Sequence, residues 1–386
     1  MSTLKVGGIR GVSASSDAIT VANDGSCTAN LTNRTNKNLI INGAMQIAQR
    51  GTSFSGTAQQ YTLDRMQMNT AGNDEIAQTE QAAVTAGGAY TSGFRKCMKI
   101  INGNQTSGAG AADIVHLKMV LEAQDIANSG WNYTSTSSFI TLSFWIKSSV
   151  AQDFPITLRS EDGTRQVYNM TTGSLSADTW TKITKTIPGN SNLQFDDNEN
   201  AGLTLFINAF VGTDYTTGSL TQNAWSAWSS AKQGDNMSSS WYTTNDATLE
   251  ITGLQLEVGS VATDFEHRSF AEELNLCKRY FNMVNGGNQS AAIYGIAYAN
   301  SNCHIIFNYP VEMRTAASAY LVNGTDYWAY IRYSSTVDAF DTLTQNISTS
   351  KNHMELMGSG NMSNSGYAGI IRPNNSTARL GFDAEL

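Results

Sequence analysis

Charged residues are scarce in this sequence. Asp, Glu, Lys and Arg make up 15% of its 386 residues, well below the usual quarter. The 24 Lys and Arg residues are scattered along the chain, and the formal net charge is −8. Because binding to a phosphate backbone needs clustered cations that displace counterions, we expect no nucleic-acid partner.

Long apolar segments are also missing. No apolar run approaches the roughly 20 residues that span a bilayer. The first residues, MSTLKVGGIRGVSASS, lack the apolar centre of a secretory signal. We therefore expect a protein that is made in a cytoplasm and does not insert into a membrane.

Motifs for metals, cofactors and catalysis are absent from the sequence. The four cysteines lie far apart, with no closely spaced pair: Cys27, Cys97, Cys277 and Cys303. Buried free thiols are the favoured interpretation of that spacing. Asp196, Asp197 and Glu199 offer hard oxygen ligands, but their spacing matches no calcium loop, so a solvated turn is favoured. With no phosphate loop or nucleophile elbow either, we expect no metal, no cofactor and no enzymatic activity.

Proline is rare, at 4 residues, whereas small polar residues and 33 glycines are abundant. This composition suits short strands and tight turns better than helices. Apolar and polar residues alternate from Ile140 to Ile146 and again from Leu203 to Ala209. Many such strands within residues 38–268 predict a jelly-roll-like β-sandwich. Residues 116–126 fit either a short helix or a strand, and we favour the strand.

A change of secondary structure is predicted near residue 269. Alternation in Leu249–Val258 changes phase at Gly253, which predicts a β-bulge. Ser269 and Glu272 then form a capping box for a short linking helix, 269–281. We expect its apolar stripe to contain Phe270, Leu274, Cys277 and Phe281. A smaller C-terminal β-sandwich is predicted over 282–386, which makes the whole chain all-β apart from this helix.

Three segments resemble a known protein family. LQLEVGSVATDFEHRSFAEELNLCKRYF, residues 254–281, is similar to a junction in virion proteins of tailed bacteriophages, chiefly tail-fibre and receptor-binding types. NLIINGAMQIAQRGTSF, residues 38–54, and YTLDRM, residues 61–66, resemble the opening strands of the same family. Met66 stands where the family often has Trp, and the chain from residue 282 matches only loosely.

The resemblance implies a structural virion protein with a tail-fibre-like role. It implies that residues 1–37 attach the chain to other virion proteins, that the chain forms a homotrimer, and that it recognises a host-surface glycan or protein. A purely structural head-decorating fibre or tail adaptor is one alternative. A glycan-degrading fibre, or depolymerase, is another.

Aromatic residues crowd one polar segment, and they are our candidates for carbohydrate binding. Exposed rings stack on the apolar face of a sugar while neighbouring amides and hydroxyls bind its hydroxyl groups. The candidates are Tyr215, Trp225, Trp228, Trp241 and Tyr242. The alternative is that Trp225 and Trp228 only fix a long loop to the sandwich or to a neighbouring subunit.

Overall fold

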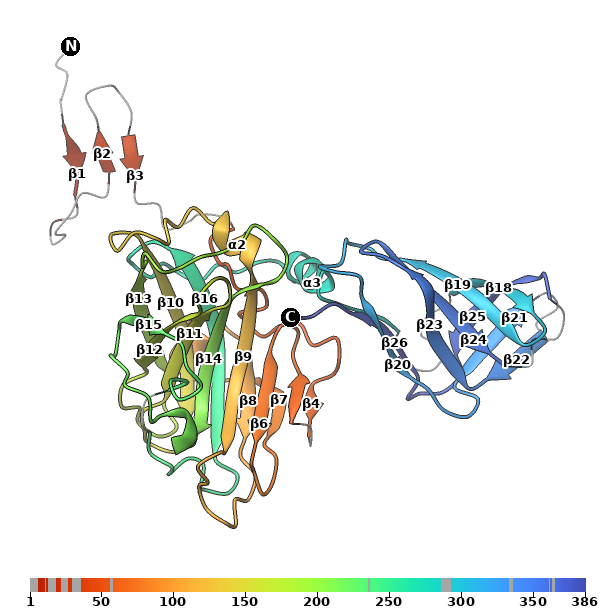
Figure 1. The fold of residues 1–386 in the computed structure, drawn as a ribbon, viewed down its shortest axis with the longest axis horizontal. Coiled ribbons are helices and arrows are strands. Elements are labelled where there is room, and N and C mark those ends of the chain that lie inside the picture. The colour runs from red at the N-terminus through yellow and green to blue at the C-terminus, as the bar shows by residue number, and fades with distance from the viewer. Residues whose placement is uncertain are drawn as a thin grey trace.

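The computed structural model describes residues 6–10, 12, 19–21, 27–29, 36–55, 58–234, 237–285, 293–332, 336–360, 362 and 365–386. It confirms the predicted fold class: two β-sandwiches are joined by a short helix (Figure 1). None of the helices in the described part of the chain is long and apolar enough to cross a membrane.

The first domain consists of two antiparallel sheets that pack face to face (Figure 1). One sheet has six strands, in the order β13 (Thr181–Pro188), β10 (Phe139–Ser148), β16 (Thr248–Val258), β8 (Lys96–Ile101), β7 (Gln78–Ala83) and β4 (Ser53–Phe54). The other has seven, in the order β15 (Trp225–Ala227), β12 (Gln166–Thr171), β11 (Pro155–Ser160), β14 (Ala201–Val211), β9 (Ile114–Glu122), β6 (Gln67–Ala71) and β5 (Gln59–Tyr61).

The core of this domain is formed by the inward residues of both sheets. Leu142 and Ile146 of β10 face Leu205 and Ile207 of β14, and all four are buried. The alternating residues that predicted these strands are therefore the residues that exclude water between the layers. Short helices cover the ends of the sandwich: α1 (Gly87–Thr91), α2 (Ala123–Ala127) and the 3₁₀ turn η1 (Thr213–Tyr215).

The segment that sequence left open between strand and helix contains both. β9 continues to Glu122, and α2 begins at the next residue, Ala123. The strand favoured from sequence is therefore correct only for the first part of 116–126.

The predicted bulge and capping box are both present. The register between β10 and β16 shifts opposite Gly253, whose φ of +66° lies in the left-handed region that glycine tolerates. Ser269 and Glu272 cap helix α3 (Phe270–Lys278) reciprocally. The predicted apolar stripe is wrong in part, because Phe270 is 59% exposed. Glu273 and Cys277 form the buried side of α3, since Glu273 accepts a hydrogen bond from the backbone of Asn42.

The expectation of opening strands over residues 38–54 is wrong for most of that segment. Only Ser53–Phe54 is a strand, and the residues before it form buried turns. Asn42, with φ of 60°, donates from its side chain to the carbonyls of Ile47 and Asp64. Gly43 packs so closely that a Cβ would lie 2.0 Å from the carbonyl oxygen of Leu254. Side chains and isolated backbone hydrogen bonds, such as Leu39 to Leu256, satisfy this backbone in place of a continuous ladder.

Much of the predicted attachment segment, 1–37, lies outside the described residues. Its described strands form a small antiparallel sheet beside the first domain (Figure 1). They are β1 (Gly8–Ile9), β2 (Ile19–Val21) and β3 (Cys27–Ala29).

The C-terminal domain has a second core of its own, built between Ala297 and Ala384. A three-stranded sheet contains β17 (Phe281–Asn285), β26 (Arg379–Asp383) and β20 (Ser318–Val322). A seven-stranded sheet runs in the order β22 (Thr336–Phe340), β21 (Trp328–Arg332), β25 (Ala368–Pro373), β18 (Ile293–Ala299), β19 (Asn302–Asn308), β24 (His353–Ser359) and β23 (Thr342–Thr349).

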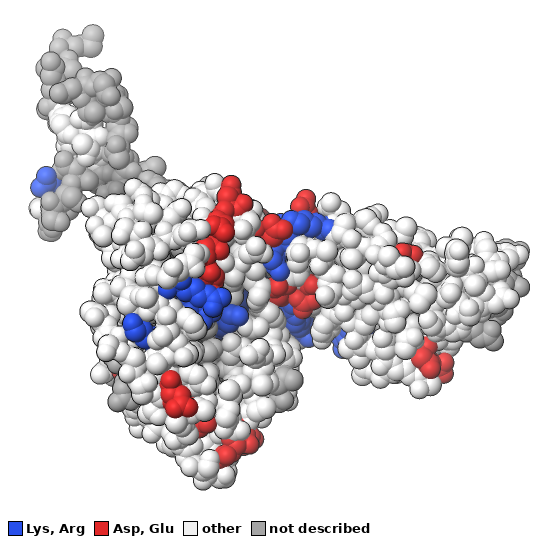
Figure 2. All heavy atoms as spheres, in the orientation of Figure 1, with Lys and Arg blue, Asp and Glu red and all other residues white. Residues whose placement is uncertain are grey.

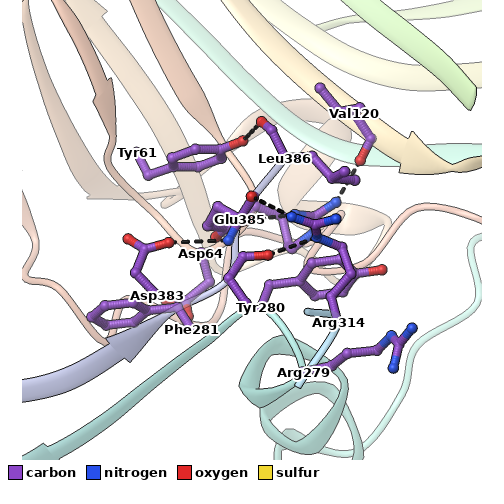
Figure 3. Close-up of polar contacts among 12 residues, drawn as sticks. Tyr61, Asp64, Val120, Arg279, Tyr280, Phe281, Arg314, Asp383, Glu385 and Leu386 are labelled. Carbon is purple, nitrogen blue, oxygen red and sulfur yellow. Dashed lines mark hydrogen bonds and ion pairs between the residues drawn. The ribbon is translucent and has the colours of Figure 1, made fainter. Parts of the chain in front are cut away.

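A buried polar cluster joins the two domains (Figure 3). Glu385 forms ion pairs with Arg65 and Arg50 of the first domain, and all three side chains are at most 4% exposed. Tyr61 donates to the backbone carbonyl of Leu386, and Arg279 pairs with Glu122 at 2.8 Å. Because the charges of Glu385, Arg65 and Arg50 are paired and shielded from water, they fix the angle between the sandwiches instead of forming an open site.

Candidate functional site

Two of the five predicted carbohydrate-binding aromatics lie in the core. Trp241 and Tyr242 are 0% exposed. The ring of Tyr242 stacks on Phe210 with centroids 4.2 Å apart, and its hydroxyl donates to Asp113 at 3.0 Å. Their assignment from sequence is wrong, since neither ring can reach a ligand. Because the surrounding sequence is polar, it suggested exposed rings, whereas both rings pack in the core at one end of the sandwich.

Trp225 and Tyr215 are half-buried and hold the long loop before β16. The Trp225 ring packs on Tyr168, and its Nε1 donates to the Pro188 carbonyl at 2.7 Å. The carbonyl of Tyr215 accepts from the backbone of Gln233 at 2.9 Å. These contacts match the anchoring alternative, whereas sugar binding by these two rings stays a prediction.

Trp228 lies beside the outer face of the seven-stranded sheet of the first domain. The guanidinium groups of Arg159 and Arg165 lie 5.4 and 5.7 Å from its ring centroid. Arg159 also lies 5.1 Å from the ring of Phe206, so one cation contacts two aromatic rings. Of the five predicted aromatics, Trp228 is the one that these contacts bring to that face.

A row of three polar side chains crosses this outer face. Asn69 on β6 pairs with His116 on β9, and His116 pairs with Asn208 on β14. Cross-strand partners project to the same side of a sheet, and neighbouring strands lie about 4.8 Å apart. We call Asn69, His116 and Asn208 the polar row; it spans on the order of 10 Å.

Each member of the polar row carries a buried atom that has no hydrogen-bond partner among the described residues. These atoms are Asn69 Oδ1, His116 Nδ1 and Asn208 Oδ1. Leaving a buried polar atom unpaired costs about 1–3 kcal/mol, so three in one row are unusual. The row therefore leaves two acceptors and one imidazole nitrogen without a partner. Asn208 at 0% and His116 at 4% exposure are covered, and the loop that contains Gln233 lies on Asn208, so a ligand would reach them only when that loop moves aside.

His116 is held in its neutral form. Burial, with smaller contributions from the Lys118 and Arg159 charges, lowers its pKa from 6.5 to about 3. Its Nε2 contacts Asn69 Nδ2 at 3.1 Å, and its ring meets Phe206 edge to face at 5.0 Å. Because the amide Nδ2 only donates, Nε2 accepts and Nδ1 carries the proton. His116 is thus a donor toward a ligand.

The next rows add charge to the face. Lys118 lies opposite Phe206 on β14, and burial followed by the Arg159 charge lowers its pKa. Arg159 and Arg165 both pair with Glu161, at 2.8 and 3.0 Å. Three cations and one carboxylate leave this area positive in a chain of net charge −8. Figure 2 shows Lys and Arg gathered over the middle of the β11, β14 and β9 strands. We call these four charged residues, the polar row, Phe206 and Trp228 together the polar sheet face.

Sequence reasoning missed most of this face. The signal was present in β14, where Thr204, Phe206 and Asn208 alternate with the core residues. His116 and Lys118 alternate in the same way in β9. The sequence of one strand does not show which distant strand pairs with it. The polar row can be recognised only once β6, β9 and β14 are known to be neighbours.

Comparisons with known proteins give weak likenesses. No protein-family model matches the chain, and no curated protein matches it. Among solved structures, it is similar to the enzymatically active domain of bacteriophage CBA120 tailspike protein 4, with 8% identity and a TM-score of 0.31. That match covers 57% of this chain and 21% of the tailspike chain.

Two carbohydrate-binding modules are also similar to it. The CBM22-1 xylan-binding domain from Paenibacillus barcinonensis has 10% identity and a TM-score of 0.28, covering 58% of this chain and 96% of that one. A family 30 carbohydrate-binding module has 14% identity and a TM-score of 0.26, covering 57% and 86%. At these values the likeness is one of β-sandwich architecture alone.

Proposed function

We propose that this chain is a structural virion protein of a tailed phage that binds a host-surface glycan through the polar sheet face. The single observation that carries the binding site is the polar row, with three unpaired buried atoms side by side on adjacent strands. Sugar hydroxyls both donate and accept, so they pair with acceptors and with a neutral imidazole N–H alike. The phage assignment rests on the resemblance of residues 38–54, 61–66 and 254–281 to tail-fibre proteins.

The charge on the face favours an acidic glycan. The side chain of Lys118 forms no hydrogen bond or ion pair with the described residues, and a carboxylate or phosphate group beside it would offset the neighbouring Arg159 charge. Arg159 and Arg165 keep one shared partner, Glu161. The excess of positive charge therefore complements uronate-, sialate- or phosphate-bearing sugars better than neutral ones.

We assign binding without catalysis. A glycosidase needs two carboxyl groups that face each other across the scissile bond. Glu161, the carboxylate of this face, is held by Arg159, Arg165 and the hydroxyl of Thr204. Such a carboxylate orients the cations and is badly placed to transfer a proton. A depolymerase is accordingly the less favoured function.

In this proposal the chain works as a tail-fibre-like homotrimer, attached to other virion proteins through residues 1–37. Several copies on one particle would multiply a modest affinity for each sugar into firm adsorption. A head-decorating fibre or tail adaptor would share the fold and lack the glycan affinity.

A titration of the purified chain with bacterial surface polysaccharides tests the binding site. Acidic capsular polysaccharides, their carboxyl-reduced neutral forms, and lipopolysaccharide O-chains form the panel, with affinity measured by calorimetry. We expect binding to acidic members that weakens as salt is raised, because screening reduces the attraction. Lys118→Gln should remove most of the preference for the acidic over the carboxyl-reduced form. A folded wild-type chain that binds no member of the panel would favour the adaptor.

A further inference from the structure

The seven-stranded sheet of the C-terminal domain has an outer face of a different kind. Its inner face packs on the domain core through residues such as Ile305, Leu356 and Ile371. On the outer side, one cross-strand row runs over four neighbouring strands: Val337, Ile331, Ile370 and Tyr294. Every member of this row is apolar or aromatic.

More apolar side chains extend this row. Ile296 pairs with His304, and Tyr298 lies against the His304 ring at 4.9 Å, so both share its side of the sheet. Ile306 follows His304 by two residues and points the same way. The exposed fractions are 83% for Tyr294, 73% for Tyr298, 67% for Ile306, 49% for Val337 and 46% for Ile296. These five residues define the apolar sheet face.

The apolar sheet face is almost free of net charge. His304 Nδ1 and Glu355 Oε1 lie 2.7 Å apart, so these two groups satisfy each other within the face. Arg372, opposite Ala329 on β21, lies toward one end. Because each chain carries a net charge of −8, two copies repel each other overall. Contact through these nearly uncharged faces would add little to that repulsion.

The area of the face fits a protein partner. At roughly 200 Å² for a whole large side chain, the five exposed fractions correspond to about 600 Å² of apolar surface per copy. A standard interface buries about 800 Å² per partner, and apolar patches of a few hundred Å² on a soluble protein mark interaction sites. Tyr294 and Tyr298 offer rings to a sugar, whereas the isoleucines and valine of the face offer neither a ring nor a hydrogen bond, so a protein partner would cover more of this face than a glycan would.

We propose that a second copy of this chain packs on the apolar sheet face. In the proposed homotrimer, the apolar sheet faces of the three copies would pack together around the three-fold axis. The tyrosine and isoleucine side chains of one copy would fill the spaces between those of its neighbours. This proposal rests on the proposed homotrimer and adds to it the surface through which the copies meet.

The test is the solution mass of three purified full-length chains by multi-angle light scattering. Wild type should have a mass about three times 41.6 kDa. Ile306→Asp places a second carboxylate on the face, on β19 opposite Glu355, and should shift the mass to that of one chain. Val261→Asp is the matched control, since Val261 is 71% exposed in the first domain, and its mass should equal that of wild type.

Two results would overturn the proposal: a wild-type chain that is monomeric at tens of micromolar, or an Ile306→Asp oligomer with the wild-type mass. Far-UV circular dichroism checks that the variant is folded, and Tyr294→Asp repeats the test at the most exposed position. Glycan affinity is measured on the same samples. A monomer that still binds glycan would contradict this interface alone, whereas an oligomer without glycan affinity would contradict the binding site alone.

Discussion

The two seven-stranded sheets of this molecule use their outer faces in opposite ways. In the first domain, the outer face buries polar and charged side chains, with Thr204 and Asn208 at most 1% exposed. In the C-terminal domain, Tyr294 and Ile306 stand exposed at 83% and 67%. A buried polar group without a partner is stabilised by a ligand that forms a hydrogen bond with it. An exposed apolar group is stabilised by contact with another apolar surface.

The difference follows from what covers each sheet. The loop between η1 and β16 lies across one side of the seven-stranded sheet of the first domain. There the Gln233 carbonyl accepts hydrogen bonds from Thr157 at 2.8 Å and from Asn208 at 3.3 Å. The loop shields part of the polar sheet face and leaves Lys118 and Arg159 partly accessible at its edge. In the proposed function, the same fold class would provide a ligand site in one domain and an association surface in the other.

The largest effect that we predict is the loss of stability when the buried ion pairs that join the two domains are broken. Glu385→Gln should lower the free energy of unfolding by about 3–5 kcal/mol, because Arg50 and Arg65 would keep buried charges without their shared partner. Urea unfolding followed by fluorescence measures it. Glu199→Gln is the control: it removes the exposed pair with Lys351 and should leave stability unchanged. Equal stability of both variants would show that the junction is loosely held.

Acid should destabilise the first domain through His116. Its pKa is depressed in the folded chain, to about 3 from 6.5. As pH falls, the unfolded chain therefore binds a proton at a higher pH than the folded chain does. The stability that depends on the neutral imidazole is present above pH 6.5 and is lost as pH falls toward 3. The loss is on the order of 4 kcal/mol. His116→Gln should flatten this part of the profile of unfolding free energy against pH. An unchanged slope between pH 6.5 and 4 would contradict the buried, neutral imidazole.

Glycan affinity should depend on Trp228 and not on every half-buried tryptophan. Trp228→Ala should weaken binding by roughly 30-fold, or about 2 kcal/mol, since it removes a ring from the polar sheet face and loosens Arg159 and Arg165. Trp180→Ala is the matched control, because Trp180 is also half-buried beside a cation, Lys147, but precedes β13 of the six-stranded sheet. Similar losses in both variants would indicate a general effect on the fold.

The smallest effect should come from the apolar sheet face under conditions that keep copies apart. In dilute solution, Tyr294→Ser should change the free energy of unfolding by no more than about 0.5 kcal/mol, as an exposed side chain contributes little within one chain. The wild-type melting temperature should rise with protein concentration and that of the variant should not. A loss above 2 kcal/mol in dilute solution would mean that Tyr294 packs within its own chain.

Local features of the fold were predictable from sequence because each depends on neighbouring residues. The phase change at Gly253 and the Ser269–Glu272 cap are examples, and both are present. Burial of an aromatic ring is a property of tertiary packing, so sequence placed Trp241 and Tyr242 on the surface, where they are not. The polar row escaped prediction because it joins strands far apart in the chain. The apolar sheet face lies mostly on the consecutive strands β18 and β19, but its exposure is a property of tertiary packing that sequence does not show.

Hydrogen–deuterium exchange with and without the tightest-binding glycan tests the division between the two faces most directly. We expect added protection in peptides from β9, β11 and β14 and in the segment around Trp228, with β18 and β19 unchanged by the glycan. Protection by the glycan at β18 and β19, with none at β9 and β14, would contradict it.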